Sequence, residues 1–229
     1  MKAAIVTGAG TGIGRETALL LAEAGWALSL VGRRKDKIES TAAAAGGSAR
    51  ALAVAGDLAE AGTVDRVVEA TLREWGRADL LVNNAAAIAL APIAETTPEL
   101  LEEIFAVNAF APALLVARLW PVFVRQGGGC VVNVSSMSSV DPFAGLSVYG
   151  AAKSALESLT RSIVNEGRAH GIRAFSVVPG CVETPMLRSL WSEDEIPGSQ
   201  AIPPRRVAQV VVDCALGRRD RDIGRAITP

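Results

Sequence analysis

The chain opens with Ala3-Ala4-Ile5-Val6-Thr7-Gly8-Ala9-Gly10-Thr11-Gly12-Ile13-Gly14, an apolar run that leads into a glycine-rich turn. The apolar run fits a buried strand, and the apolar periodicity of residues 13–24 predicts a helix that ends at Gly25. Glycines have no Cβ atom, so the turn between strand and helix can be tight. A strand, a glycine turn and a helix in this order indicate an α/β fold.

The rest of the chain continues the alternation of strands and helices. Further strands are predicted over residues 26–31, 51–55, 80–82, 130–134, 172–178 and 226–228. Further helices are predicted over residues 35–45, 63–74, 98–124, 149–167 and 203–216. This pattern predicts a Rossmann-type, doubly wound parallel sheet of about seven strands with helices on both faces. Because no linker or repeat divides the sequence, we expect one domain over residues 1–229.

Composition and charge exclude several classes of protein. The chain has 229 residues, of which 50% are hydrophobic, and its formal net charge is −1. This balance indicates neither a nucleic acid nor an anionic membrane as a partner. Three widely spaced cysteines (Cys130, Cys181 and Cys214) argue against a disulfide framework or a metal site and favour a reducing compartment. No apolar run reaches the ~20 residues of a membrane-spanning helix, so we expect a cytoplasmic protein.

The glycine turn is suited to binding a nucleotide phosphate. Gly8, Gly12 and Gly14 form a GxxxGxG pattern, whereas the G-x-G-x-x-G fingerprint fails because Ile13 stands at its third glycine. Without Cβ atoms the backbone can approach a pyrophosphate, and the free N–H groups of the following helix attract anions. A tight strand-to-helix turn with no ligand is the alternative interpretation.

The end of the second predicted strand bears on the choice of nucleotide. An acidic residue at this position would accept a hydrogen bond from the free ribose 2′-hydroxyl of NAD. The position holds Gly32-Arg33-Arg34 instead. Since a guanidinium pairs with a phosphate and cannot accept from a hydroxyl, Arg33 and Arg34 favour NADP. Exposed loop charges with no ligand remain the alternative.

A second group of polar residues is suited to proton transfer. Tyr149 and Lys153 stand four residues apart on a predicted helix and therefore share a face. A lysine ammonium beside the phenol is expected to lower its pKa from the usual value of about 10, which makes it a usable acid and base. Ser136 can donate to a carbonyl oxygen on which negative charge develops.

Together these motifs resemble those of the short-chain dehydrogenase/reductase family, over essentially the whole chain. Residues 7–14 match TGxxxGxG, residues 149–153 match YxxxK and residues 179–184 match PGxVxT. Asn108 matches the asparagine of the long helix, and Ser136 matches the catalytic serine. The resemblance implies hydride transfer between the nicotinamide C4 of NADP(H) and a carbonyl or secondary alcohol, with Asn108, Ser136, Tyr149 and Lys153 as the catalytic residues.

The resemblance completes the predicted cofactor-binding set. The set is Gly8, Thr11, Gly12, Ile13, Gly14, Arg33, Arg34, Asp57, Leu58, Asn84, Ala85, Tyr149, Lys153, Pro179, Gly180, Val182 and Thr184. By resemblance, Asp57 and Leu58 border the adenine, whereas Val182 and Thr184 hold the nicotinamide carboxamide. Asn108 would anchor a water of the proton relay.

The sequence departs from the family pattern in two places. Ala86 stands where the family has the glycine of NNAG, so it would be strained if its φ were positive. The carboxyl terminus lacks the usual closing segment, which favours a homodimer through the helices at 98–124 and 149–167 over a homotetramer.

Residues 185–202 are expected to cover a small-molecule substrate. Met186, Leu187, Leu190 and Trp191 in this segment either form a lid over a hydrophobic substrate or pack the segment onto the body. The alternative to an oxidoreductase is a catalytically idle NAD(P)-binding sensor or scaffold, against which the intact catalytic set argues. A histidine-based hydrolase is poorly supported because His170 is the only histidine.

Overall fold

A computed structural model describes residues 1–47 and 50–229 as α/β layers around one parallel sheet. The strand order is β3-β2-β1-β4-β5-β6-β7, and every adjacent pair is parallel. The strands are β1 (Ala3–Thr7), β2 (Ala27–Gly32), β3 (Ala51–Ala55), β4 (Leu80–Asn83), β5 (Gly129–Val134), β6 (Ile172–Val177) and β7 (Ala226–Ile227). The order reverses direction between β1 and β4, which confirms the predicted doubly wound fold.

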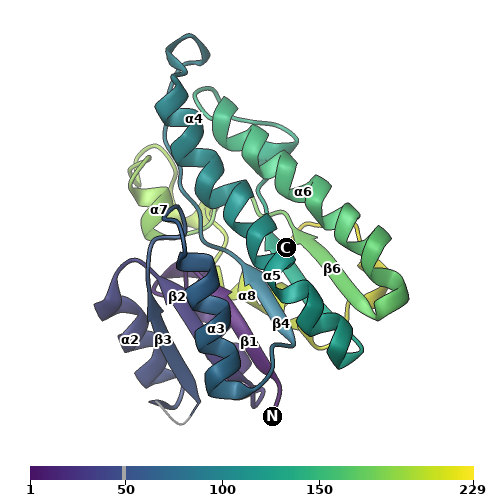
Figure 1. Cartoon of the computed structure of the whole chain (residues 1–229). Helices are drawn as coiled ribbons and strands as arrows, with labels where there is room; N and C mark the ends of the chain where they lie inside the picture. Colours follow the sequence, from purple (N-terminus) through teal and green to yellow (C-terminus); the bar gives the residue numbers. More distant parts are fainter. Residues whose placement is uncertain (48–49) are drawn as a thin grey trace.

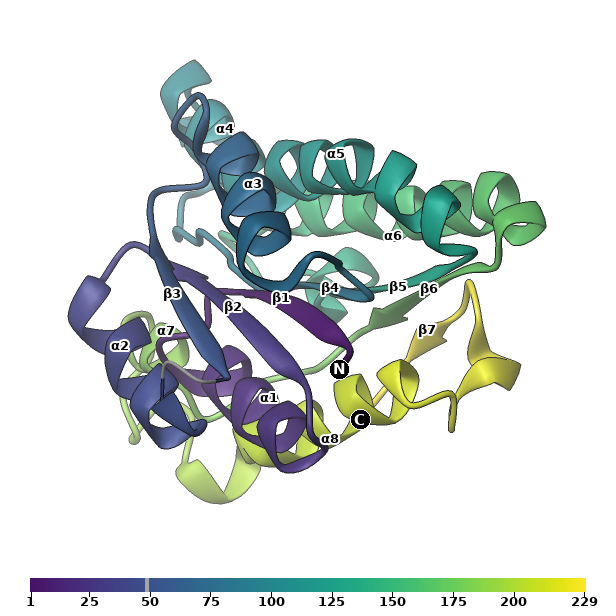
Figure 2. The same ribbon diagram turned by 60° about the horizontal axis from the view of Figure 1, so that its bottom comes forward.

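Helices cover both faces of this sheet (Figures 1 and 2). One layer contains α3 (Thr63–Trp75), α4 (Pro98–Phe105), α5 (Ala111–Gln126) and α6 (Ser147–Gly167). The other contains α1 (Gly12–Glu23), α2 (Lys35–Ala44) and α8 (Pro204–Ala215). Figure 2 shows the sheet between these two layers. A short helix, α7 (Pro185–Arg188), follows β6.

Alternate residues of the central strands fill two separate cores. Val82 and Val132 belong to the core beneath α1 and α8, whereas Leu81 and Val131 belong to the core beneath α3, α5 and α6. Side chains alternate between the faces of a strand, so both faces of β4 and β5 are buried. This explains why these strands read as continuous apolar runs.

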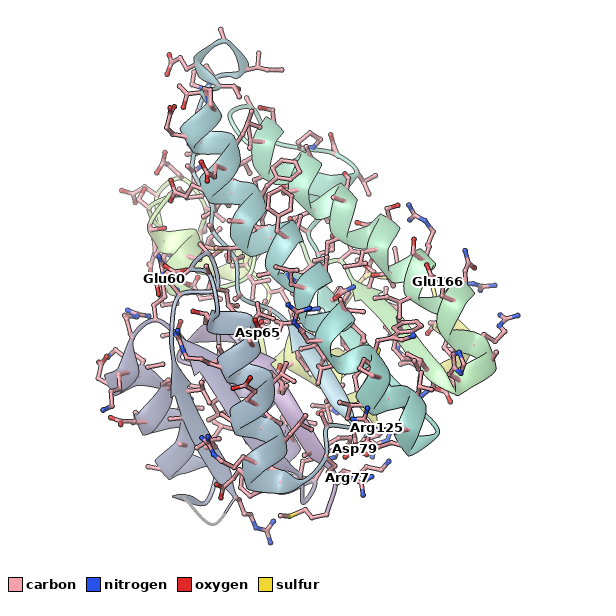
Figure 3. All side chains as sticks on the ribbon, viewed as in Figure 1. Glu60, Asp65, Arg77, Asp79, Arg125 and Glu166 are labelled. Carbon is pink, nitrogen blue, oxygen red and sulfur yellow. The ribbon has the colours of Figure 1, made fainter. Side chains whose placement is uncertain are left out.

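The amino ends of the strands are held together by a charged residue. The carboxylate of Asp79 accepts a hydrogen bond from the backbone N–H of Ala3 (2.8 Å) and pairs with Arg77 (2.6 Å). Arg77 and Asp79 are labelled in Figure 3 near the end of α5 that carries Arg125. The start of β1 is thereby tied to the residue preceding β4, far from the carboxyl ends of the strands.

The long helix predicted over residues 98–124 is continuous but not uniformly α-helical. A π-helical segment, Ala106–Phe110, separates α4 from α5 and contains Asn108. The amide Nδ2 of Asn108 donates to the carbonyl of Ile104, four residues earlier, at 2.7 Å. A side chain that competes for this carbonyl disturbs the regular ladder, and such π-bulges often occur at functional sites.

The same helical run corrects the expectation about membrane-spanning length. The helical run Pro98–Gln126 has 29 residues and contains an 18-residue stretch with a mean hydropathy of 1.7, which by length and composition alone could cross a bilayer. However, its inner face packs on the sheet, where Leu115, Leu119 and Phe123 are fully buried. Contacts of this sheet-covering helix with the core account for only part of its apolar character, because a third of the apolar stretch is buried.

Two smaller expectations concern the departures from the family pattern. Every residue with a positive φ in the described chain is a glycine, so Ala86 takes an ordinary backbone conformation and the strain considered for it does not arise. The short final strand predicted over residues 226–228 is present as β7, which pairs with β6 through Ser176 and Val177.

The segment predicted as a covering loop at 185–202 contains α7 and a short 3₁₀ turn, Gly198–Gln200.

Candidate active site

A cavity of about 710 Å³ opens beyond the carboxyl ends of the strands. Its lining includes residues that follow each of β1 to β6, on both sides of the point where the strand order reverses. Ligands of doubly wound sheets bind at such a point. The lining contains every residue of the predicted catalytic and cofactor-binding sets except Gly14 and Asn108.

The glycine turn needs its glycines for two different reasons. Gly8 and Gly12 have φ values of +64° and +54°, a backbone region that other residues rarely adopt. Gly14 is already inside α1, and a Cβ atom there would lie 2.3 Å from the carbonyl oxygen of Gly8. Its absence lets α1 pack closely on the turn, so Gly14 shapes the site without lining the cavity.

The amino terminus of α1 offers backbone donors to the cavity. Thr11 precedes the helix in an extended conformation, and within the described chain its hydroxyl makes no capping hydrogen bond. Gly12 and Ile13, the first two helical residues, line the cavity. Their N–H groups and the positive end of the helix dipole fit the pyrophosphate of a dinucleotide.

The turns after β1 and β4 are locked together by one threonine. The hydroxyl of Thr7 donates to the carbonyl of Val82 (3.1 Å) and accepts from the N–H groups of Asn84 (2.9 Å) and Ala85 (3.0 Å). The side-chain amide of Asn84 in turn donates to the carbonyl of Thr7 at 2.8 Å. Asn84 therefore also fixes the glycine turn, and Thr7, which the predicted set omitted, organises both loops.

The nucleotide end of the cavity is rich in cations. Arg33 and Arg34 follow β2, and Lys37 in the first turn of α2 joins them in the lining. Lys37 was missed because a lone lysine in a predicted helix gives no signal of its own. Arg33 pairs with Asp57 at 3.7 Å, but both side chains are exposed enough for this ion pair to contribute little. Three cations against one carboxylate give this end a net positive charge.

Burial controls the ionisation of the two central groups. Lys153 is 2% exposed, and its Nζ donates to the carbonyl of Val134 at 2.9 Å. Burial lowers the pKa of Lys153 to about 7. Burial also raises the pKa of Tyr149 to about 12, and the nearby Ser136 hydroxyl acts in the opposite direction. The expected lowering of the Tyr149 pKa by lysine is therefore wrong for this geometry, although Nζ lies 5.6 Å from the phenol ring centroid.

The hydroxyl of Ser136 is oriented by the backbone after it. Its Oγ accepts a hydrogen bond from the N–H of Ser138 (3.1 Å) at the start of the 3₁₀ turn Met137–Ser139. Because this bond occupies a lone pair, the hydroxyl proton remains available for a ligand oxygen or the phenol. The Ser139 hydroxyl donates to the carbonyl of Ser136 at 2.7 Å, which holds the turn closed.

A carboxylate on α6 braces this serine-rich turn from outside. One oxygen of Glu157 accepts hydrogen bonds from the hydroxyls of Ser135 (3.0 Å) and Ser139. Ser135 also reaches the backbone carbonyl of Lys153 at 3.3 Å. Glu157 was missed by sequence reasoning, although its position four residues after Lys153 places it on the same face of the helix.

Asn108 lies outside the cavity lining, but the hydrogen-bonding state of its side-chain oxygen bears on its predicted role. Its amide Nδ2 donates to the carbonyls of Ala87 (2.8 Å) and Ile104. The Oδ1 of Asn108 is buried and has no hydrogen-bond partner among residues 1–47 and 50–229. A buried acceptor in this condition is usually satisfied by water or a ligand.

The segment after β6 contributes apolar side chains to the cavity. Met186, Leu190 and Trp191 line it, while Leu187 both lines it and is buried. The Thr184 hydroxyl begins α7 by accepting from the N–H of Leu187 at 3.3 Å. Within the described part of the chain, no three His, Cys, Asp or Glu side chains are arranged to hold a metal ion.

Comparison with known proteins agrees with this architecture. The short chain dehydrogenase family pattern matches residues 2–195. The short chain dehydrogenase/reductase astE of Aspergillus oryzae is 37% identical over 196 residues, which are 84% of this chain and 75% of that protein. A crystal structure of 3-ketoacyl-(acyl-carrier-protein) reductase from Brucella melitensis complexed with NADH superposes with a TM-score of 0.92 at 31% identity, covering 99% of this chain and 96% of that one.

A second solved structure carries the phosphorylated nucleotide. An NAD(P)-dependent dehydrogenase from Beutenbergia cavernae, with NADP bound at low occupancy, superposes with a TM-score of 0.90 at 32% identity, covering 99% of this chain and 94% of that one. The family match spans most of the sequence, and the similarity to these structures spans nearly all of it. The chain belongs to the short-chain dehydrogenase/reductase family of NAD(P)-dependent oxidoreductases.

Proposed function

We propose that the chain is an NADP(H)-dependent oxidoreductase that interconverts a carbonyl compound and a secondary alcohol. The observation that carries this proposal is that Ser136, Tyr149 and Lys153 line the same cavity as the glycine turn and the amino end of α1. A nucleotide and a proton-transfer group therefore meet in one space, and both sites belong to a single catalytic unit formed by residues 1–229.

Each catalytic residue has a role that follows from its surroundings. NADPH, when bound, supplies a hydride from its nicotinamide C4. Ser136 donates a hydrogen bond to the carbonyl oxygen as negative charge develops there. Tyr149 gives its phenolic proton to the same oxygen, and its high pKa keeps the phenol protonated until then. The product is a secondary alcohol, and the reverse reaction oxidises this alcohol to the carbonyl compound.

Lys153 and Asn108 would restore the proton to Tyr149. With a pKa of about 7, Lys153 can release and regain a proton near neutral pH. Among the described residues its Nζ donates to the carbonyl of Val134 alone, so further donors are available for the nicotinamide ribose or for a proton relay. The free Oδ1 of Asn108 supports its role as the anchor of a relay water.

The preference for NADP is supported by the charge at the nucleotide end. Arg33, Arg34 and Lys37 surround the position beyond β2 where a 2′-phosphate would lie, and a carboxylate there would instead favour NAD. The similar structures hold either NADH or NADP, so similarity to them does not decide between NADP and NAD for this chain. The other cofactor-binding residues named above are proposed to hold the nucleotide in both cases.

A homodimer in the cytoplasm is the proposed working form. The outer surface of the α4–α5 run exposes Leu101 (41%), Phe110 (56%) and Leu114 (49%), which an apolar contact between two copies would cover. A molecular mass near twice 23.7 kDa in solution would support this form, and a monomeric mass would contradict it.

A titration with each nucleotide followed by a turnover assay tests the proposed function. Purified protein should bind NADPH more tightly than NADH and then oxidise NADPH when a ketone is added. Nucleotide binding with no turnover across neutral, polyhydroxylated and anionic ketones would favour the alternative, an idle sensor or scaffold. If neither nucleotide binds, the proposal is wrong.

A further inference from the structure

The charged residues of the cavity divide it into two unlike parts. Four of the charged lining residues, Arg33, Arg34, Lys37 and Asp57, belong to the nucleotide end, whereas Lys153 belongs to the reacting centre and Glu103 lies on α4. Beyond the reacting centre at Tyr149, the lining is formed mainly by apolar side chains from the loop after β4, the loop before α6 and the segment around α7. The part of the cavity left for a substrate therefore offers contact area but little charge.

Two aromatic rings from distant segments meet in this apolar part. Phe143, in the loop before α6, and Trp191, after α7, have ring centroids 6.0 Å apart with an interplanar angle of 54°. Trp191 packs on a cluster that includes Tyr149 and Leu146, whereas Phe143 remains 58% exposed. A ketone with its oxygen at Ser136 and Tyr149 would thus have its carbon skeleton against this aromatic pair.

The covering segment, residues 185–202, contains one cationic side chain, and that side chain is bonded within the segment. Arg188 is the only Lys or Arg in residues 185–202. Its guanidinium pairs with the carboxylate of Glu183 and donates to two backbone carbonyls of the same segment at 2.8 and 3.0 Å. These bonds use most of its donors, and the described residues do not place Arg188 in the cavity lining.

Beyond the nucleotide end and the reacting centre, the one charged residue of the described lining is negative. Glu103 on α4 lines the cavity, and residues 193–195 of the covering segment are Glu, Asp and Glu, all exposed. Beyond the reacting centre, the described lining offers no cation to a phosphorylated or carboxylated substrate, and Glu103 would repel it. A polyhydroxylated substrate would leave its hydroxyls against apolar walls, which costs free energy when they are unpaired.

We infer that the substrate is a neutral, hydrophobic ketone whose body includes a ring. This inference rests on the proposed function and names the substrate class of the same site. Ring faces and edges stack on aromatic side chains more favourably than open polar chains do. The reaction transfers a hydride to the carbonyl carbon and a proton from Tyr149 to the oxygen, so that the ring ketone becomes a ring-bearing secondary alcohol and NADPH becomes NADP⁺.

Three probe ketones test the inference with the intact protein and NADPH. The probes are 2-tetralone, which is neutral and bicyclic, acetoacetyl-coenzyme A, which is anionic, and D-fructose, which is polyhydroxylated. We expect kcat/KM for 2-tetralone to exceed both other values by about a hundredfold, the difference expected from apolar burial and charge together. A preference for either other probe would overturn the inference and leave the proposed function standing.

Matched substitutions locate the effect in the aromatic pair. Trp191→Ala and Phe143→Ala should each lower kcat/KM for 2-tetralone about tenfold, mainly through KM, the loss expected for one aromatic contact. The control is Val140→Ala, since Val140 is 68% exposed and lies outside the cavity lining. NADPH affinity should stay constant in all three variants. Losses of equal size on all three probes would mean that the aromatic pair is only structural, which contradicts the inference.

A failure of the proposed function gives a different result. In that case the protein binds NADPH but reduces none of the three probes, and the substitutions have no turnover to change. The inference would then fail together with the function on which it rests.

Discussion

Removal of the Glu157 carboxylate tests whether the serine-rich turn is held in place from α6. Glu157→Ala deletes the acceptor shared by the hydroxyls of Ser135 and Ser139, which flank the turn that carries Ser136. Hydrogen bonds to a charged group contribute about 1.5–3 kcal/mol when buried, and the partial exposure of Glu157 places the total loss at ~2 kcal/mol. For a chain of this length, that loss corresponds to a fall in Tm of about 4–8 °C.

The kinetic effect of Glu157→Ala should be separable from its effect on stability. Displacement of Ser136 by a loosened turn should lower kcat about tenfold, which corresponds to ~1.4 kcal/mol in the activation free energy, with NADPH affinity unchanged. Glu157→Gln keeps an acceptor oxygen and should recover most of kcat. Glu166→Ala is the matched control because Glu166 is an exposed carboxylate of the same helix (Figure 3).

The assay compares kcat, KM and thermal unfolding for the three variants, with kinetics measured at least 15 °C below each Tm. If Glu157→Ala loses stability but keeps its full kcat below that temperature, the carboxylate does not position Ser136. A fall in kcat of the same size for Glu166→Ala would also contradict this role, because the effect would not be specific to Glu157.

Three further predictions concern the nucleotide end and the buried lysine. Arg33→Ala should weaken NADPH binding by about ten- to a hundredfold and NADH binding by less than about twofold, because one phosphate contact is lost; equal losses in a titration would show that Arg33 does not touch the 2′-phosphate. Gly14→Ala should weaken both nucleotides alike and lower the free energy of unfolding by about 1–3 kcal/mol, since its Cβ would lie 2.3 Å from the carbonyl of Gly8; calorimetry and titration check both. Burial lowers the pKa of Lys153 to about 7 in the folded chain, so the unfolded chain binds more protons between pH 7 and about 10. The free energy of unfolding should therefore gain a contribution from Lys153 that rises with pH over this range. Lys153→Met should remove this contribution, and identical profiles of unfolding free energy against pH for the two proteins would contradict the burial of Lys153.

Much of the fold could be predicted from the sequence because its signals are local. The apolar run before Gly8, the periodic helix after it and the glycines themselves specify a strand, a turn and a helix within a few residues. The same holds for the strands that end at Asn83 and Val134, where apolar runs stop at polar side chains. These strand ends also locate the site, since parallel strands present their carboxyl ends at one edge.

What escaped prediction depends on contacts between segments. The π-helical segment follows from a side-chain bond of Asn108 to a backbone carbonyl, which helical periodicity does not reveal. The raised pKa of Tyr149 follows from burial, whereas spacing showed only that a lysine was near. The brace from Glu157 to the serine turn and the internal pairing of Arg188 likewise join residues whose proximity only the folded chain shows.

In the proposed function, Tyr149 transfers the proton in a site that binds NADPH. The most direct test measures NADPH affinity and single-turnover NADPH oxidation with a ketone for the wild-type chain and for Tyr149→Phe. We expect nearly equal affinities and a loss of oxidation of at least about a thousandfold, within the range that acid–base catalysis contributes. Oxidation by Tyr149→Phe at a rate close to that of the wild type would contradict this role of Tyr149, because the proton would then come from another group.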